Sequence, residues 1–124
     1  MDKRILIVDD SAPIRGLIRT LIESRPGIKV CGEAADGLEG IEKGLELKPD
    51  LIVLDFSMPR LNGLQAAFML HEVAPDTPII MFTLYKDAIL SRLAHNSGVT
   101  SVVSKTDQLT ILADEVQRLT TSTN

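Results

Sequence analysis

Five short apolar runs, spaced along 124 residues, constrain the fold of this chain more than any other feature. The first, third and fourth are long enough to be apolar on both faces, as expected of strands buried in a parallel sheet. The runs are residues 5–8, 30–31, 51–54, 79–82 and 102–103.

The segments between these runs have the apolar spacing of helices that face a core. Ser11 and Asp36 are predicted to cap the first two helices, Asp36 in a capping box with Glu39, and Asp107 is predicted to open the last. Strict alternation of this kind predicts an α/β fold, a doubly wound (βα)5 arrangement with helices on both faces of a five-stranded parallel sheet. The predicted inward positions are Ile14, Leu17, Ile18, Leu21 and Ile22; Leu38, Ile41 and Leu45; Leu64, Ala67, Phe68 and Leu70; Ala88, Ile89 and Leu93; and Leu109, Leu112, Val116 and Leu119.

Charge and cysteine content narrow the functional classes. The formal net charge of −4 provides no basic face for nucleic-acid phosphates. A single cysteine, Cys31, excludes an internal disulfide and favours a reducing compartment; we expect it to be a small buried apolar residue. No run of 18 apolar residues is present, so the expected location is the cytoplasm, without membrane contact.

Polar groups follow four of the five predicted strands. Asp9 and Asp10 end the first strand, Asp55 ends the third, Thr83 the fourth and Lys105 follows the fifth. Because ligands bind beyond the carboxyl ends of the strands in such sheets, we expect these groups to meet at one edge. Each of them taken alone is also typical of a solvated loop or a helix cap, so the prediction depends on the joint pattern.

Three carboxylates in one pocket repel one another unless a cation lies among them. Oxygen ligands of this kind suit Mg²⁺, which commonly uses one or two carboxylates and several waters. A carboxylate can also act as a nucleophile and carry an aspartyl phosphate. Asp55, which ends the central strand, is the best candidate for that nucleophile, with Thr83 and Lys105 beside it to neutralise phosphoryl charge.

These residues resemble the motifs of bacterial two-component response-regulator receiver domains, including the chemotaxis regulators. The matching segments read VDDS at 8–11, LDFSMPRLNG at 54–63, FT at 82–83 and SK at 104–105. The resemblance implies a flavodoxin-like sheet with strand order 2-1-3-4-5, an order taken from the family. We therefore interpret residues 1–124 as one receiver domain, with 120–124 as a disordered tail or the start of a linker.

For the phosphorylation site, the resemblance implies that Asp55 accepts a phosphoryl group from a sensor histidine kinase or a phosphotransfer protein. It implies that Asp10 and Asp55 bind Mg²⁺ directly, that the backbone carbonyl of Ser57 is a third ligand, and that Asp9 acts mainly through water.

For signal output, the resemblance implies that Thr83 and Lys105 contact the phosphoryl oxygens and change the face formed by the fourth helix, the fifth strand and the fifth helix. The expected partner of that face is an output domain or protein, or a second copy after phosphorylation. Direct nucleic-acid binding by these residues is not expected.

Two positions depart from the family pattern. Val102 stands three residues before the lysine, where receivers often have an aromatic ring that turns inward on activation. Thr106 replaces a frequent proline, and because a cis bond without proline costs about 2.5–4 kcal/mol, we expect a trans peptide there. Tyr85, two residues after Thr83, is expected at the mouth of the site.

Three other functions compete with this interpretation. A phosphatase that forms an aspartyl phosphate needs a general acid two residues after the nucleophile, where this chain has Ser57. Flavin binding needs a phosphate loop after the first strand, where Asp9 and Asp10 instead repel phosphate. The chain is therefore not expected to be an enzyme beyond its own phosphorylation and slow dephosphorylation. The third alternative, that the chain is the receiver part of a larger transcription regulator, stays open.

Overall fold

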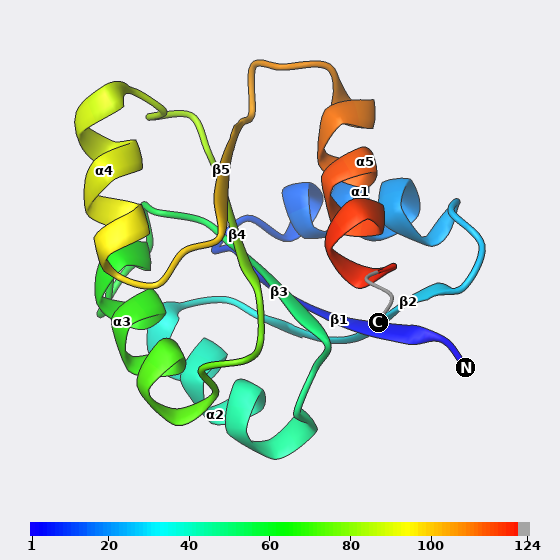
Figure 1. Cartoon of the computed structure of the whole chain (residues 1–124), viewed down its shortest axis with the longest axis horizontal. Coiled ribbons are helices and arrows are strands. Elements are labelled where there is room, and N and C mark those ends of the chain that lie inside the picture. Colours follow the sequence, from blue (N-terminus) through cyan, green and yellow to red (C-terminus); the bar gives the residue numbers. More distant parts are fainter. Residues whose placement is uncertain (122–124) are drawn as a thin grey trace.

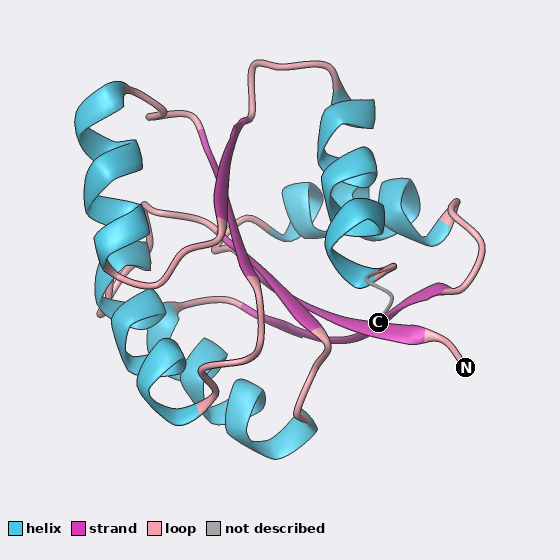
Figure 2. Cartoon of the chain, viewed as in Figure 1, coloured by secondary structure: helices cyan, strands magenta, loops and turns pink. Residues whose placement is uncertain are grey.

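The computed structural model describes residues 1–121 and confirms the predicted (βα)5 alternation (Figure 2). Five strands each lead into a helix, and the second and fifth strands are longer than their apolar runs. The elements are β1 (Lys3–Val8), α1 (Ala12–Glu23), β2 (Ile28–Ala34), α2 (Gly37–Leu47), β3 (Leu51–Leu54), α3 (Gly63–Val73), β4 (Ile79–Thr83), α4 (Ala88–Asn96), β5 (Ser101–Ser104) and α5 (Leu109–Thr120).

The five strands are parallel and form one sheet in the order β2-β1-β3-β4-β5, as the family resemblance implied. β1 and β3 are neighbours near the centre, and Val8 pairs with Leu54 at their carboxyl ends. The next residues along each strand, Asp9 and Asp55, are therefore adjacent. The order in which successive strands are added to the sheet reverses between β1 and β3, so this is the switch point at which such sheets bind ligands.

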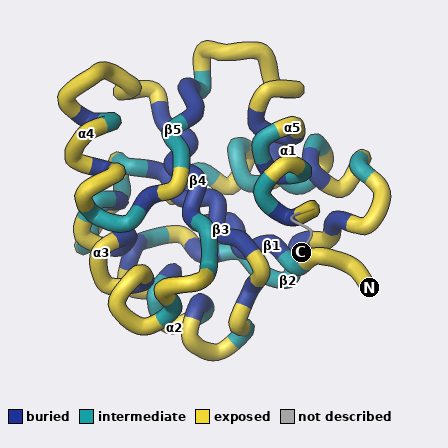
Figure 3. The backbone as a smooth tube through the Cα atoms, viewed as in Figure 1, coloured by how far each residue is buried: buried dark blue, intermediate teal, exposed yellow. Residues whose placement is uncertain are grey.

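Two helical layers cover the sheet, with α1 and α5 on one face and α2, α3 and α4 on the other (Figure 1). Alternate strand residues face opposite layers: Ile5 and Ile7 pack toward α1 and α5, whereas Leu6 and Val8 pack toward α2, α3 and α4. All four side chains are at most 1% exposed. The strands therefore form a buried centre between solvent-facing helices (Figure 3).

The predicted inward faces of α2 and α4 are largely wrong, whereas that of α3 is wrong only at Phe68, since Ala67 and Leu70 are buried and Leu64 is partly buried. Large apolar side chains that were expected in the core are exposed: Leu38, Leu45, Phe68, Ile89 and Leu93. The buried residues that the sequence did not predict include Leu90 and four small residues: Gly40, Gly44, Ala66 and Ala94.

In α2 the physical reason for this difference is the close packing of the helix against the sheet and against α3. A Cβ atom on Gly40 would lie 2.8 Å from Val8 Cγ1, and one on Gly44 would lie 2.7 Å from Leu70 Cδ2. Hydropathy alone cannot identify a face made of small residues. In α1 and α5 the predicted core residues Ile18, Ile22, Leu112 and Val116 are buried as expected, although Leu17 and Leu109 are exposed.

Several predicted helix ends are confirmed and others are corrected. Ser11 caps α1 by accepting from the Ile14 N–H, and Asp36 caps α2 by accepting from the Glu39 N–H. The reciprocal bond expected from the Glu39 side chain goes to the Ala35 N–H instead. Asp107 does not cap the last helix, because α5 begins two residues later.

The last residues and the cysteine also differ from expectation. Thr120, assigned to the tail, is the buried last residue of α5, and its hydroxyl donates to the Val116 carbonyl. The rest of the predicted tail, apart from Thr121, lies outside the described residues. Cys31 is half-buried rather than buried, because β2 is an edge strand. None of the helices within residues 1–121 has both the length and the apolar character that a membrane crossing requires.

Candidate phosphorylation site

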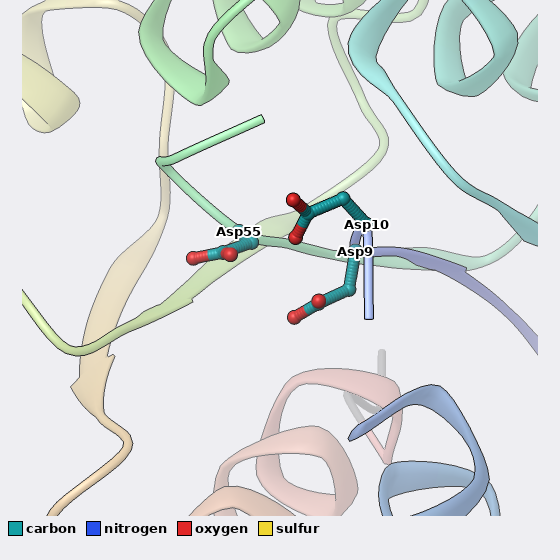
Figure 4. A group of neighbouring side chains, drawn as sticks. All are labelled: Asp9, Asp10 and Asp55. Carbon is teal, nitrogen blue, oxygen red and sulfur yellow. The ribbon is translucent and has the colours of Figure 1, made fainter. Parts of the chain in front are cut away.

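Three carboxylates meet where β1 and β3 end. Asp9 and Asp10 follow β1 and Asp55 follows β3, and one carboxylate oxygen from each lies within 4.8 Å of the others. Their carboxyl groups point to the same side of the strand ends (Figure 4). Asp9 and Asp55 are buried, whereas Asp10 is exposed. The structure thus brings together the three acidic residues predicted for this edge.

Lys105 reaches the same cluster from the end of β5. Its Nζ atom lies 2.8 Å from Asp9 Oδ2 and 3.2 Å from Asp55 Oδ2. The position is fixed by the sheet, because the Lys105 N–H extends the ladder by donating to the Thr83 carbonyl at 2.8 Å. One ammonium group therefore faces two buried carboxylates.

Burial and neighbouring charge perturb the titration of both kinds of group. Burial raises the pKa of Asp55, and the Asp9 carboxylate raises it further, which together outweigh the lowering effect of Lys105. Burial disfavours the charged form of Lys105, but the hydrogen bond to Asp9 and the charge of Asp55 hold the pKa of its ammonium above the usual value. Lys105 therefore stays protonated. Its positive charge compensates only part of the cost of burying the ionised carboxylate of Asp55.

These groups line an open cavity of about 390 Å³. Predicted site residues Asp9, Asp10, Asp55, Ser57 and Lys105 all contribute to its wall, together with Tyr85 at the position expected for it. The remaining lining residues, which the sequence did not point to, are Ser11, Ile14 and Leu84.

Thr83 is the predicted site residue that does not line this cavity. It is fully buried at the end of β4, and its hydroxyl oxygen accepts a hydrogen bond from the Tyr85 N–H at 3.2 Å. A hydroxyl has one donor and two acceptor positions, so the Thr83 hydroxyl can still donate its proton to another acceptor. Thr83 is therefore next to the site but behind its surface.

The loop between β3 and α3 is held close to Asp55. The Gly63 N–H donates to the Phe56 carbonyl at 2.7 Å, and a Cβ atom at Gly63 would lie 2.3 Å from the Asp55 carbonyl oxygen. Only glycine fits this approach. Arg60, in the left-handed region at φ 68°, pairs with Asp36 at 2.6 Å and ties the loop to α2.

This loop also contains features that the sequence prediction missed. Asn62 and Gln65 form a full capping box at the start of α3, which the Asn-x-x-Gln spacing signals. The contacts of Arg60 had no comparable signal in the sequence. Across residues 1–121 no peptide bond is cis, so the trans peptide expected at Thr106 is confirmed.

The donor set fits a small hard cation. Three carboxylate oxygens that can share one ion, with water access through an open cavity, match the oxygen ligands and retained waters of Mg²⁺. A cation at this point would also offset the repulsion between Asp9 and Asp55 that Lys105 only partly relieves. The cluster can therefore hold a metal ion beside the buried carboxylate of Asp55.

Comparisons with known proteins agree with this geometry. Residues 5–117 match the family model described as the response regulator receiver domain. The chain is 41% identical over 103 residues to the protein-glutamate methylesterase/protein-glutamine glutaminase of Thermotoga maritima, which covers 82% of the chain but 30% of that relative. The corresponding protein 1 of Myxococcus xanthus is 36% identical over 115 residues, covering 93% and 33% respectively.

Solved structures share the whole fold. The response regulator domain of Thermotoga maritima CheB superposes with a TM-score of 0.90 at 32% identity and covers 100% of both chains. A LuxR-family two-component response regulator from Aurantimonas superposes with a TM-score of 0.93 at 29% identity, covering 98% of this chain and 86% of that one. The chain spans only about a third of the length of these curated relatives, and the matched range contains every candidate site residue.

Proposed function

The chain belongs to the response regulator receiver domain family, and from that premise we propose that it is a phosphorylation switch in which Asp55 accepts the phosphoryl group. The observation that supports this assignment best is the position of Asp55. Its carboxylate ends a central strand, opens into the cavity, and lies 3.2 Å from the ammonium of Lys105 and beside two other carboxylates.

Mg²⁺ is the proposed cofactor. Asp10 and Asp55 are the proposed direct carboxylate ligands, the Ser57 backbone carbonyl the third, and Asp9 a ligand through water. When bound, the ion neutralises negative charge on the phosphoryl oxygens during transfer. Asp9 is already engaged by Lys105 at 2.8 Å and by the Ser11 N–H at 2.9 Å, which supports its indirect role.

In the proposed reaction a carboxylate oxygen of Asp55 attacks the phosphorus of a phosphohistidine on a sensor kinase or a phosphotransfer protein. The new O–P bond forms as the P–N bond breaks, and the electron pair of that bond returns to the imidazole nitrogen. Phe56 supports the geometry, because its N–H donates to Asp55 Oδ1 at 2.8 Å. Lys105 supplies positive charge to the transferred group.

Output is proposed to pass through Thr83 and Lys105 to the face of α4, β5 and α5. The Thr83 hydroxyl proton can turn toward a phosphoryl oxygen, which would draw the end of β4 toward the site. Ile89 and Leu93 on α4 are 73% and 47% exposed, so this face presents apolar side chains to a partner. The proposed partner is an output domain or protein, or a second copy after phosphorylation.

Catalysis is proposed to be limited to the phosphorylation and slow dephosphorylation of the chain itself. Methylesterase activity is named for relatives of which the chain spans about a third, and the alternative that the chain is the receiver part of a larger transcription regulator stays equally open. Residues 1–124 are proposed to act as one receiver domain. The cytoplasm is the proposed location, since a chain with one cysteine needs no oxidising compartment.

Mass spectrometry after incubation with acetyl phosphate and Mg²⁺ tests the acceptor. The wild-type chain should gain a single phosphate, and Asp55→Asn should gain none, because the amide is a poor nucleophile. Asp76→Asn, in the loop before β4, is the matched control and should be phosphorylated like the wild type. An equal yield in Asp55→Asn would refute the assignment.

A further inference from the structure

We propose that Arg15 is a positioning residue for the Asp10 carboxylate and acts through the peptide bond that joins Asp9 to Asp10. The inference rests on the proposed function, because it takes Asp10 to be a metal ligand. Arg15 lies on α1 and is not among the residues that line the cavity. Its role comes from a contact to the main chain of Asp9 and Asp10, which we call the acidic loop.

The guanidinium group of Arg15 joins that loop to β2. Nη1 donates to the Asp9 carbonyl oxygen at 2.7 Å, and Nε donates to Glu33 Oε1 at 2.9 Å. Only 17% of the Arg15 side chain is exposed. Because the guanidinium is planar and its donors are fixed relative to one another, the two bonds set the Asp9 carbonyl at a defined place relative to β2.

This carbonyl lies where regular pairing of β1 stops. The Asp9 N–H donates to the Ala34 carbonyl at 3.0 Å and is the last contact of β1 with the β2 ladder. The Asp9 side chain is held by Ser11 and Lys105. Within residues 1–121 no side-chain hydrogen bond is seen for Asp10. Its direction is therefore set through the backbone.

The peptide plane connects the two residues mechanically. The Asp9 carbonyl and the Asp10 nitrogen and Cα belong to one planar group, so the direction of the carbonyl fixes the place of the Asp10 Cα. A bond from Arg15 to that carbonyl restricts rotation of the plane. Arg15 thus keeps Asp10 placed so that its carboxylate faces Asp55, in the way that residues hydrogen-bonded behind metal ligands orient those ligands.

Glu33 anchors the arginine. Burial opposes the charged form of Glu33, yet hydrogen bonds from Arg19 and Arg15 hold the pKa of its carboxyl below the usual value. Arg19 Nε donates to Glu33 Oε2 at 2.9 Å but makes no contact with the Asp9 carbonyl. Arg19 is therefore a matched control, because it shares the helix, the charge and the Glu33 partner of Arg15 but not the contact to the acidic loop.

Calorimetric titration with Mg²⁺ in the absence of phosphodonor tests the proposal. Arg15→Ala should weaken Mg²⁺ binding about 10- to 100-fold, the usual effect of losing a residue that orients a metal ligand by a hydrogen bond. Arg19→Ala should bind Mg²⁺ like the wild type. Arg15→Lys should also bind more weakly than the wild type, since one ammonium cannot reproduce the two fixed donors.

Thermal unfolding of each variant separates positioning from stability. A merely structural role predicts a lower melting temperature for Arg15→Ala with unchanged Mg²⁺ affinity, and that outcome would overturn the proposal. If Arg15→Ala does not fold, Arg15→Lys decides in the same way. Failure of the wild type to bind Mg²⁺ would overturn the proposed function, and this inference with it, whereas equal binding by wild type and Arg15 variants overturns only the role of Arg15.

Discussion

Leu54 and Asp55 are consecutive residues, but they belong to two regions with opposite effects on stability. Leu54 is completely buried among apolar side chains of β3 and the α2–α4 layer. Asp55 is 6% exposed and faces another buried carboxylate, Asp9. Burying a leucine side chain stabilises a fold by about 1.5–3 kcal/mol, whereas a buried carboxylate destabilises it unless its charge is compensated.

The difference shows how this fold supports its site. The apolar interior stabilises the sheet and fixes the strand ends, so that charged groups can be held together although they repel. Lys105 offsets part of that repulsion, but the pKa of Asp55 remains raised by burial and by Asp9. The interior therefore supplies the stability that keeps the repelling carboxylates of the site together, and substitutions should separate the two regions.

The largest effect is expected in the interior. Leu54→Ala should lower the free energy of unfolding by about 2–5 kcal/mol, because it removes buried methyl groups and leaves a cavity. Urea denaturation measures this change. Leu93→Ala, at a leucine of α4 that is 47% exposed, is the control and should change stability by no more than about 0.5 kcal/mol. Similar losses in the two variants would contradict the assignment of the core.

The next largest effect is expected at Asp55, where a substitution should increase the free energy of unfolding. Because the folded state raises the pKa of Asp55, its contribution to stability is greatest below the unfolded pKa and is lost as pH rises through the folded pKa. At neutral pH the ionised carboxylate therefore destabilises the fold. Asp55→Asn should raise the free energy of unfolding by roughly 1–2 kcal/mol at pH 7 in EDTA.

Mg²⁺ should reverse the relative stabilities of the wild type and Asp55→Asn. Mg²⁺ should stabilise the wild type by binding its folded state and should stabilise Asp55→Asn much less. Denaturation of both proteins with and without Mg²⁺ measures the difference. A loss of stability in metal-free Asp55→Asn would contradict this sign. It would show that the charged edge of the sheet, formed by Asp9, Asp10, Asp55 and Lys105, stabilises the folded state as the apolar interior does.

The sequence predicted the charged edge better than the helical packing. Each strand is a short apolar run, and a parallel sheet brings the residues that follow its strands to one edge, so Asp9, Asp10, Asp55 and Lys105 were predictable from their positions. The strand order needed the family resemblance, because alternation alone does not say which strands are neighbours.

Packing of small residues was not predictable in the same way. Gly40 lies against Val8 of β1 and Gly44 against Leu70 of α3, whereas Leu45 beside Gly44 is exposed, because α2 approaches too closely for large side chains. The contacts of Arg15 depend on tertiary structure, since the arginine and Glu33 are 18 residues apart. No local pattern in the sequence indicates that pair.

A smaller effect is expected on the coupling between the charged edge and the α4–β5–α5 face, which is the proposed surface for a partner. Thr83→Ala should still accept phosphoryl but should lose about 1 kcal/mol of the coupling between the site and the α4–β5–α5 face, because no hydroxyl can follow the phosphoryl group. NMR shifts on that face, with and without phosphorylation, measure the response. Thr83→Ser keeps the hydroxyl and should respond like the wild type. A full response in Thr83→Ala would remove Thr83 from the pathway.

The smallest effect concerns the mouth of the cavity, where an apolar ring stands beside the charged edge. Tyr85 is 56% exposed and packs edge-on against Phe56, with ring centroids 6.2 Å apart. Hydrolysis of the phosphorylated chain needs a water in line with the Asp55–phosphorus bond, and a ring at this position hinders its approach. Tyr85→Ala should shorten the phosphate half-life about two- to fivefold, a barrier change below about 1 kcal/mol.

Phosphate loss followed over time with excess Mg²⁺ measures this half-life. Tyr85→Phe keeps the ring and should match the wild type, so a faster loss in that variant would assign the effect to the hydroxyl instead. If Tyr85→Ala loses phosphate no faster than the wild type, the ring does not protect the acceptor. Tyr85 would then be grouped with the exposed apolar residues of the neighbouring helix α4, whose expected role is contact with a partner.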